Sequence, residues 1–363
     1  MNKLVKCSTI VCLSGAALLQ NAVAAEWTNR TTISGFSSAI YQKTNESSAF
    51  NGADHIGVGN HGSFNGTRIG ININSKVNDK IRLASQFVSS QENNNFSTKL
   101  DWAFISIDLT DSLTLRTGKV KYPVGIVNEY RAVGYAYPWI TPPALMYSLI
   151  SAGPQATRES YTGASFLWTK DFDELMTSVD LFTGEVDLES MRVINMVGTT
   201  AKLNWQDMIT IQGSYYHGEM DPDSSSMSNM NSMMSAMKGQ PHSALALGAK
   251  AELSNALLYA EYADIDMGNF KMGKGKTWYV SGGYHLGNFL PYGTIEYYEK
   301  GKDTMGHSKQ YKGSLGMRYD FMTSADLKFE LSRIHTSAGT GLFASTPDNA
   351  DVNMYGISLD VVF

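Results

Sequence analysis

The chain has 363 residues, of which 29 are lysine or arginine and 34 are aspartate or glutamate, so its formal net charge is −5. This acidic balance argues against a nucleic-acid partner, because proteins that bind nucleic acids usually present a basic face to the phosphates. The sequence contains no run of about 20 apolar residues, which excludes a helical membrane protein.

The first 25 residues have the features of a secretory signal peptide. Two lysines lie near the start, residues 13–19 form a short apolar run, and the small residues 22–25 provide an A-x-A cleavage site. The run is too short to span a bilayer as a helix. We therefore expect residues 1–25 to be removed on export. Residues 26–363 are expected to form one domain, because no linker or change in composition divides them.

The two cysteines of the chain, Cys7 and Cys12, lie within this segment. The exported chain would therefore have no disulfide framework, and its stability must come from elsewhere. Loss of Lys3 and Lys6 with the same segment would change the formal net charge from −5 to −7.

Apolar residues recur at every second position along the rest of the chain, whereas helical periodicity is hard to find. Alternation with a period of two predicts β-strands. Sixteen such segments can be marked, and an even number is typical of bacterial outer-membrane barrels. They are 31–43, 66–77, 79–91, 97–109, 112–120, 157–169, 175–185, 195–205, 207–218, 242–253, 255–263, 275–286, 289–300, 309–320, 324–335 and 351–363.

The connections between these segments favour a barrel. Tight turns, for example at Asn78, Gln206 and Ser254-Asn255, alternate with longer connections. In an antiparallel barrel every second connection emerges at the same rim, so one rim would carry the tight turns and the other the long loops. A soluble β-sandwich has no reason to sort its loops by length. The longer connections are 44–65, 92–96, 121–156, 186–194, 219–241, 264–274, 301–308 and 336–350.

The two faces of the predicted strands differ in chemistry. In strand 324–335, Leu327 and Phe329 alternate with Asp326 and Lys328. A barrel in lipid places its apolar side chains outside and its polar side chains toward water in the lumen. We therefore predict the all-β class, with a transmembrane antiparallel β-barrel of sixteen strands in a Gram-negative outer membrane.

The last strand keeps this alternation to the final residue. Phe363, Val361, Leu359, Ile357 and Tyr355 are all apolar or aromatic. The chain as a whole resembles the general porins of Gram-negative bacteria, which form sixteen-stranded trimers. The resemblance lies in the signal peptide, the strand number, the sorting of the loops by length and the terminal Phe363. The resemblance implies a homotrimer in contact with outer-membrane lipid and lipopolysaccharide. It also implies that the barrel-assembly machinery reads the strand that ends at Phe363.

The longest connection, residues 121–156, is unusually rich in proline, aromatic and apolar side chains. A solvated outer loop would be polar, so Trp139, Ile140 and Leu145 need a place to be buried. The segment resembles the third loop of the porins, which folds into the barrel and narrows the pore. We expect the same inward course here.

Charged side chains on the wall would then face this loop. The alternation along the strands places the side chains of Arg68, Arg82 and Arg116 on the inner face of the wall. The loop contributes Glu129, with Arg131 beside it. The resemblance implies that such opposed charges select small polar solutes. The plain alternative is that the arginines are only solvated side chains of the lumen.

The loop is also rich in aromatic rings. They could form a path for sugars, but packing of the loop and contacts between copies is the preferred interpretation, because a loop of this length must be anchored. We include Tyr135 and Tyr137 among the expected constriction residues. The six rings are Tyr122, Tyr130, Tyr135, Tyr137, Trp139 and Tyr147.

The connection 219–241 contains six methionines among serines and asparagines. Thioethers are soft ligands that prefer Cu(I), so capture of copper by this outer loop is one hypothesis. Flexible low-complexity composition is the alternative, and we predict no metal site or cofactor. The six are Met220, Met227, Met230, Met233, Met234 and Met237.

No sequence motif of an enzyme is present: we find no H-E-x-x-H, G-x-S-x-G or phosphate-binding loop. The sequence therefore predicts a porin that allows passive diffusion of small hydrophilic solutes and ions, without chemistry of its own. Two alternatives stay open. One is a channel specific for one solute, and the other is a barrel whose outer surface binds a ligand such as a metal.

Overall fold

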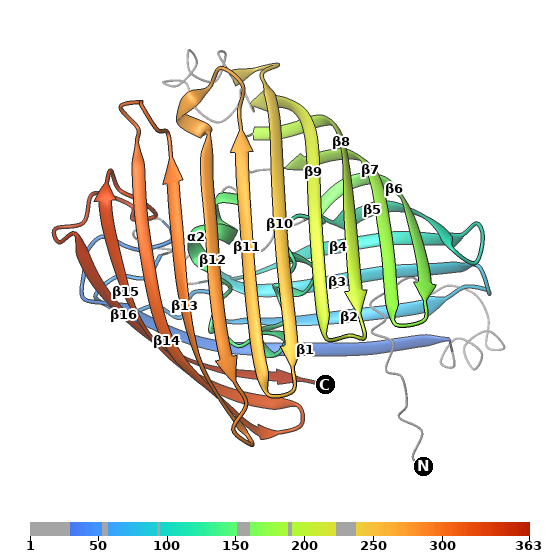
Figure 1. The fold of residues 1–363 in the computed structure, drawn as a ribbon, viewed down its shortest axis with the longest axis horizontal. Coiled ribbons are helices and arrows are strands. Elements are labelled where there is room, and N and C mark those ends of the chain that lie inside the picture. Colours follow the sequence, from blue (N-terminus) through green and yellow to red (C-terminus); the bar gives the residue numbers. More distant parts are fainter. Residues whose placement is uncertain (1–29, 53–56, 93–94, 151–159, 188–190, 223–236) are drawn as a thin grey trace.

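A computed structural model describes residues 30–52, 57–92, 95–150, 160–187, 191–222 and 237–363. Sixteen antiparallel strands form a closed barrel in which each strand pairs with its neighbours in the sequence and β1 pairs with β16 (Figure 1). The strands are β1 (Thr31–Thr44), β2 (Arg68–Lys76), β3 (Ile81–Glu92), β4 (Asn95–Asp108), β5 (Leu113–Lys121), β6 (Ser160–Phe172), β7 (Leu175–Asp187), β8 (Met191–Trp205), β9 (Ile209–Pro222), β10 (Pro241–Leu253), β11 (Ala256–Asp266), β12 (Gly275–Tyr284), β13 (Phe289–Lys300), β14 (Ser308–Met322), β15 (Ala325–Ala338) and β16 (Asp351–Val362).

The helical segments of the described chain are short. They are the 3₁₀ turns η1 (Asn128–Tyr130), η2 (Gly134–Ala136) and η4 (Lys271–Gly273), and the helix α2 (Ala144–Ile150). Among the residues that the structure describes, none of the helices is long and apolar enough to cross a membrane.

The predicted barrel of sixteen antiparallel strands is confirmed, and each predicted strand overlaps one observed strand. The predicted connections 92–96 and 186–194 are wrong in length. Pairing continues to Glu92 and Asn95 in one hairpin and to Asp187 and Arg192 in the other. The ladders extend here because polar residues at the rim can still form backbone hydrogen bonds, so a loss of apolar alternation does not end a strand.

Alternation along each strand separates an apolar outer face from a polar inner face, as predicted. On β15, Leu331 is 68% exposed, whereas Lys328 on the opposite face is 0% exposed. The apolar rows of β2, with Ile69 and Ile71, also point outward. An apolar outer surface of this kind suits contact with hydrocarbon.

Exposed aromatic side chains gather beside the tight turns. Girdles of aromatic side chains flank the apolar band of outer-membrane barrels at both interfaces between lipid and water. These rings therefore indicate one membrane boundary. The group comprises Phe172, Trp205, Tyr284, Phe289, Phe321 and Phe363.

The two ends of the described barrel meet at a seam between β1 and β16. Gly35 and Phe363 exchange both backbone hydrogen bonds, with N···O distances of 2.7 and 2.9 Å. The ring of Phe363 lies over Gly35, where an added Cβ would be 2.4 Å from Cζ of the ring. The glycine thus provides the space in which the terminal ring packs against the first strand.

Replacing Gly35 with valine is expected to reduce the folded fraction, because the new side chain displaces the Phe363 ring from the seam. Overpacking of this kind typically costs about 1–3 kcal/mol. The folded fraction can be measured by the mobility of unheated samples on a denaturing gel. Gly313→Val is the matched control, since Gly313 also lies on a strand but is exposed, and an added Cβ there meets nothing within 4 Å. Equal folded fractions for the two variants would contradict a role of Gly35 in closure.

Candidate functional site: the loop inside the barrel

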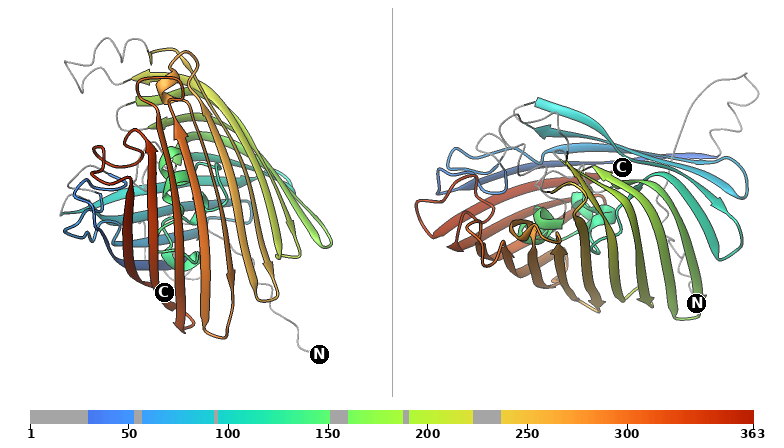
Figure 2. Two further views of the ribbon diagram at one scale, coloured as in Figure 1. Left: turned by 60° about the vertical axis from the view of Figure 1, so that its left-hand side comes forward. Right: turned by 90° about the horizontal axis from the view of Figure 1, so that it is seen from above.

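The connection after β5 folds into the lumen. We call residues 122–150 the inserted loop; its turns and α2 lie between opposite walls of a flattened barrel (Figure 2). At its start, Pro123 O accepts hydrogen bonds from Thr200 on β8 and Gln212 on β9, with donor–acceptor distances of 3.1 and 3.5 Å. The prediction of an inward-folded loop is confirmed.

Glu261 on β11 holds the first part of the inserted loop. Its carboxylate is 3% exposed and accepts hydrogen bonds from the Ile126 N–H at 2.7 Å and from the Tyr147 and Tyr279 hydroxyls at 2.6 Å each. Gly125 precedes this contact with φ +85°, a conformation that favours glycine. A buried carboxylate needs such donors, so Glu261 fixes the backbone turn and α2 to the same point on the wall.

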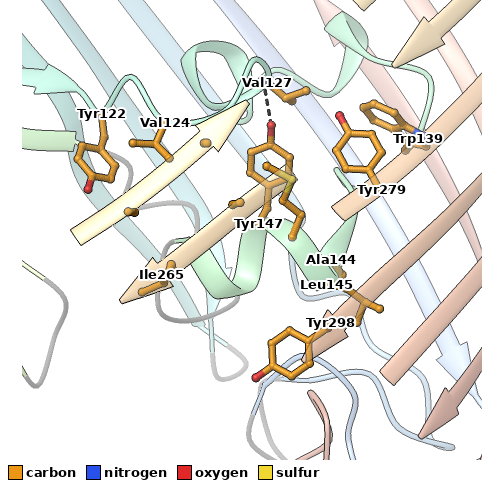
Figure 3. Packing of buried hydrophobic residues seen from close by; sticks show 14 of the residues in the cluster. Tyr122, Val124, Val127, Trp139, Ala144, Leu145, Tyr147, Ile265, Tyr279 and Tyr298 are labelled. Carbon is orange, nitrogen blue, oxygen red and sulfur yellow. Dashed lines mark hydrogen bonds between the residues drawn. The ribbon is translucent and has the colours of Figure 1, made fainter. Parts of the chain in front are cut away.

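Aromatic packing continues this attachment. Figure 3 shows Tyr147 between the loop backbone and the wall, with its hydroxyl accepting a hydrogen bond from the Val127 N–H at 3.0 Å. The Trp139 indole N–H donates to Ser281 Oγ and Thr294 Oγ1, both at 3.0 Å. The ring packs edge-on against Tyr279 at a centroid distance of 5.7 Å. The aromatic residues of the loop thus anchor it to strands β11 to β13.

A second carboxylate, that of Glu296 on β13, binds the start of α2. The Leu145 N–H donates to Glu296 Oε2 at 2.9 Å, and the Lys312 ammonium lies 2.8 Å from Glu296 Oε1 and 3.5 Å from Glu330 Oε1. All three charged side chains are at most 5% exposed. The wall therefore binds backbone N–H groups of the loop with acids whose charge a neighbouring lysine offsets.

The turn at Gly134, near the middle of the loop, contacts a fully buried lysine. Lys328 Nζ donates to Gly134 O at 2.7 Å and lies 3.0 Å from Asp360 Oδ2 and 3.8 Å from Asp326 Oδ1. An added Cβ on Gly134 would be 1.9 Å from Asp360 Oδ1, so only glycine allows this close approach. The Tyr137 ring faces the lysine at 4.9 Å.

Three of the predicted constriction residues come together around the middle of the loop. Arg68 donates to Ala132 O and to Tyr137 Oη, both at 2.6 Å, and the Tyr137 hydroxyl donates to Arg131 O at 3.1 Å. Burial raises the pKa of Tyr137 to about 12 although Arg68 opposes this, so the phenol remains neutral. Arg131 lies over the Tyr147 ring at 5.3 Å. Arg68 and Arg131 are both buried and hold the loop in place.

The other predicted residues lie elsewhere in the lumen. Arg82 pairs with Asp108 at 2.6 Å, and Arg116 pairs with Asp180. Each acid stands on the same wall as its arginine, so these charges are offset locally.

Two residues of the loop itself complete the predicted set. Glu129 is half-exposed and lies 3.2 Å from Lys202 on β8, so this acid of the loop does face a wall cation, but not one of the predicted arginines. The Tyr135 hydroxyl donates to Thr323 O at 3.0 Å, and its ring lies 4.6 Å from the Arg318 guanidinium. The seven predicted residues therefore form a cluster around Arg68 and separate pairs, not one ring of charges.

Comparison of the sequence gives no relative: no family model matches the chain, and no curated protein matches it. Comparison of the structure with solved structures finds similar proteins. An anion-selective porin from Comamonas acidovorans is 11% identical, with a TM-score of 0.61 over 92% of this chain and 99% of that chain. The Salmonella typhi OmpF complex with daunomycin is 13% identical, with a TM-score of 0.59 over 92% and 97%. OmpT of Vibrio cholerae is 12% identical, with a TM-score of 0.56 over 92% and 98%.

The chain has the porin fold. It is a multi-pass β-barrel of the outer-membrane type, and its strand number, closure and inserted loop agree with those expected from the resemblance. At 11–13% identity the likeness concerns the fold and carries no residue roles to this chain.

Several residues that hold the loop in this porin fold were missed by the sequence analysis. Asp326 and Lys328 were placed on the inner face, but no contact with the loop was assigned to them. The available signal was charge at inward positions of otherwise apolar strands, since a lumen that receives a polypeptide segment needs partners for its backbone. The missed set is Glu261, Glu296, Lys312, Asp326, Lys328 and Asp360.

Four of the six aromatic rings that were considered as a path for sugars are buried in this structure. Tyr122, Tyr137, Trp139 and Tyr147 are at most 4% exposed, so their rings pack within the protein. Of the six methionines, Met220 on β9 belongs to the main cluster of buried apolar residues, which also contains Trp139 and Tyr147. Met237 is partly buried and packs against this cluster. Met227, Met230, Met233 and Met234 lie outside the described residues. Within the part of the chain that is described, no three His, Cys, Asp or Glu side chains are grouped to hold a metal ion.

Proposed function

We propose that the chain is a passive outer-membrane channel for small hydrophilic solutes and ions. The observation that carries this proposal is the inner face of the barrel, where charged and polar side chains of the wall enclose a loop that crosses the lumen. Selection by size and by the charges of the lumen would be the mechanism, with no chemical step. Export would require removal of residues 1–25.

The inserted loop divides the charges along the proposed passage. Arg82 and Glu129 are more than one-third exposed, and Lys202 and Arg116 are partly exposed, so they are accessible to water on the side of strands β3 to β8. Arg68, Arg131 and Tyr137 are buried and would fix the width of the passage indirectly, by holding the loop. We assign the constriction to these groups together with Tyr135.

A homotrimer fits the proposal. One of the structurally similar proteins, OmpT of Vibrio cholerae, is described in a trimer form. The apolar outer face would contact lipid, lipopolysaccharide and the neighbouring copies, and the strand ending at Phe363 would be read by the barrel-assembly machinery.

Planar-bilayer recording of the purified full chain tests this function. We expect discrete conductance steps, grouped in threes for a trimer, with a reversal potential in a salt gradient that reports the sign of the preferred ion. Addition of detergent alone is the blank. Absence of conductance from protein that migrates as a folded barrel would refute the proposal.

A further inference from the structure

A histidine lies among methionines at the outer ends of strands β9 to β11, which are neighbours in the wall (Figure 1). His242 on β10 is 3% exposed and Met220 on β9 is 1% exposed. Met267, the first residue after β11, packs against the main cluster of buried apolar residues, to which Met220 belongs. One imidazole and two thioethers therefore gather where the lumen meets the outer rim.

The ladder between β9 and β10 places Met220 beside His242. His242 pairs with Gly218, and two residues further along the strands the Met220 N–H donates to Gln240 O at 2.9 Å. His242 and Met220 are therefore diagonal neighbours on the inner face of the wall. Long side chains can span the distance between such positions.

The ladder between β10 and β11 places Met267 on the other side of His242. Ser243 pairs with Asp266, so His242 and Met267 are the next residues in this register. The register continues past the ladder, because an added Cβ on Gly268 would be only 2.6 Å from Cγ of the proline that precedes His242. The imidazole is thus flanked by a methionine from each neighbouring strand.

One nitrogen of the His242 ring is already oriented by a hydrogen bond. Nδ1 lies 3.0 Å from Tyr216 Oη, and the two rings are stacked with an interplanar angle of 17°. Within the described part of the chain, Tyr216 is the hydrogen-bond partner of this ring. With the proton on Nδ1, the lone pair of Nε2 is left for a metal ion, and metal-binding histidines commonly have their other nitrogen held in this way.

The charged groups near the ring are engaged elsewhere. Asp266 and His217 act electrostatically on His242. The Asp266 carboxylate pairs with Lys274 at 2.8 Å and accepts the Gly268 N–H at 2.7 Å, and His217 is exposed on the opposite face of β9. The donors that flank the ring on the inner face are therefore the two sulfur atoms.

Access to this group is from the outer rim. Met267 is partly buried, and its sulfur lies against η4, where an added Cβ on Gly273 would be 2.0 Å from Sδ. Met237 is partly buried as well, and its carbonyl accepts the Gln240 N–H at 3.0 Å. A methionine side chain is unbranched and has three rotatable bonds, so Met267 Sδ can turn from η4 toward the ring. An ion can thus enter past side chains that are partly exposed.

We propose that His242 Nε2 and the sulfur atoms of Met220 and Met267 bind one Cu(I) ion at the outer end of the lumen. Thioethers are soft ligands that favour Cu(I), and imidazole binds copper as well. Of the three ligands, Met220 alone belongs to the methionines that the sequence analysis considered. The site goes beyond the proposed function, because passive diffusion of solutes does not require it.

Calorimetric titration of the detergent-folded full chain with Ag(I), a redox-stable substitute for Cu(I), tests the site. We expect one tightly bound equivalent with a Kd of about 1 µM or below. Met220→Leu, Met267→Leu and His242→Phe should each weaken it at least about tenfold, because each removes a ligand and keeps a side chain of similar size. Met354→Leu is the matched control, since Met354 is also buried on the inner face, on β16, and its loss should leave the affinity unchanged.

A second control separates this site from the other methionines of the connection 219–241. Joint replacement of Met227, Met230, Met233 and Met234 by serine should leave the tightly bound equivalent in place. Loss of that equivalent in this variant, or an unchanged affinity in the three ligand variants, would overturn the site.

Two further measurements test the identity of the metal. In ascorbate, the chain should compete with the chelator bicinchoninate for Cu(I), and failure to compete would overturn Cu(I) as the ion. Zn(II) that binds as tightly as Ag(I), with the same sensitivity to the methionine variants, would overturn the assignment to a soft metal. Each of these outcomes is independent of the channel function, which bilayer recording tests separately.

Discussion

Replacement of residues 122–159 by a short Asn-Gly turn is expected to raise the single-channel conductance severalfold and to admit larger solutes. The inserted loop is the segment that crosses the lumen, and its removal uncovers the inner face of strands β8 to β16. Lys121 and Ser160 are directly paired, so a tight turn can join β5 to β6 without strain on the ladder. Planar-bilayer recording and uptake of neutral oligosaccharides of increasing size measure the effect.

The barrel itself should survive this deletion, because its strands pair with one another and not through the loop. The fraction that migrates as a folded barrel before heating provides this check. A matched control shortens residues 302–306 between β13 and β14, a connection at the outer rim that does not enter the lumen. Conductance that is unchanged by loss of the inserted loop, from protein shown to be folded, would mean that the loop does not limit the passage.

The architecture could be predicted because one rule governs every strand. A strand with lipid on one side and a polar lumen on the other must alternate, and Ile69 and Ile71 on β2 show this pattern as clearly as Phe329 and Leu331 on β15. The pattern fails at the rims, where neither lipid nor the core selects the side chains. This explains why the extended hairpins beyond Gln91 and Glu185 were taken for loops.

The course of the loop could be predicted only in outline. Its apolar and aromatic composition indicates burial, and the barrel offers one place for it. The alternation along a strand shows which wall side chains point into the lumen. It does not show how far along the barrel axis, or where around the barrel, each of them lies. The contact of Ile126 with Glu261 joins positions 135 residues apart, and that of Gly134 with Lys328 joins positions 194 residues apart. No local pattern in the sequence records such pairs.

The predicted site illustrates the same limit. Arg68 was selected as a cation facing the pore, and inward parity is correct for it. What parity does not give is its partners: the guanidinium donates to the Tyr137 hydroxyl and to the carbonyl of Ala132. A guanidinium that binds a backbone carbonyl of the loop positions that loop, and this follows only from the packing of two distant segments. The roles of the arginines as solvated side chains or as anchors could not be distinguished from residue type.

Lys328→Ala is expected to lower the free energy of unfolding and to release the turn at Gly134 in the inserted loop. The lysine is 0% exposed and offsets two carboxylates that are also 0% exposed, Asp326 and Asp360. Removal of one partner from a buried ion pair typically costs about 3–5 kcal/mol, because the remaining charge stays buried without compensation. Urea unfolding in lipid vesicles measures the stability, and bilayer recording should show noisier and larger currents as the loop loses its contact at Gly134.

A second variant separates charge compensation from simple loss of packing. Combining Lys328→Met with Asp360→Asn removes one charge of each sign and keeps most of the volume, so it should recover much of the stability that Lys328→Ala loses. Lys80→Ala, at an exposed turn between β2 and β3, should change stability by less than about 0.5 kcal/mol. If the double variant were as unstable as Lys328→Ala, the hydrogen bond to Gly134 O would account for the effect, since both variants lack it. Recovery in the double variant with currents that remain noisy would instead assign stability to the ion pair and closure of the passage to the lysine's bond with the loop.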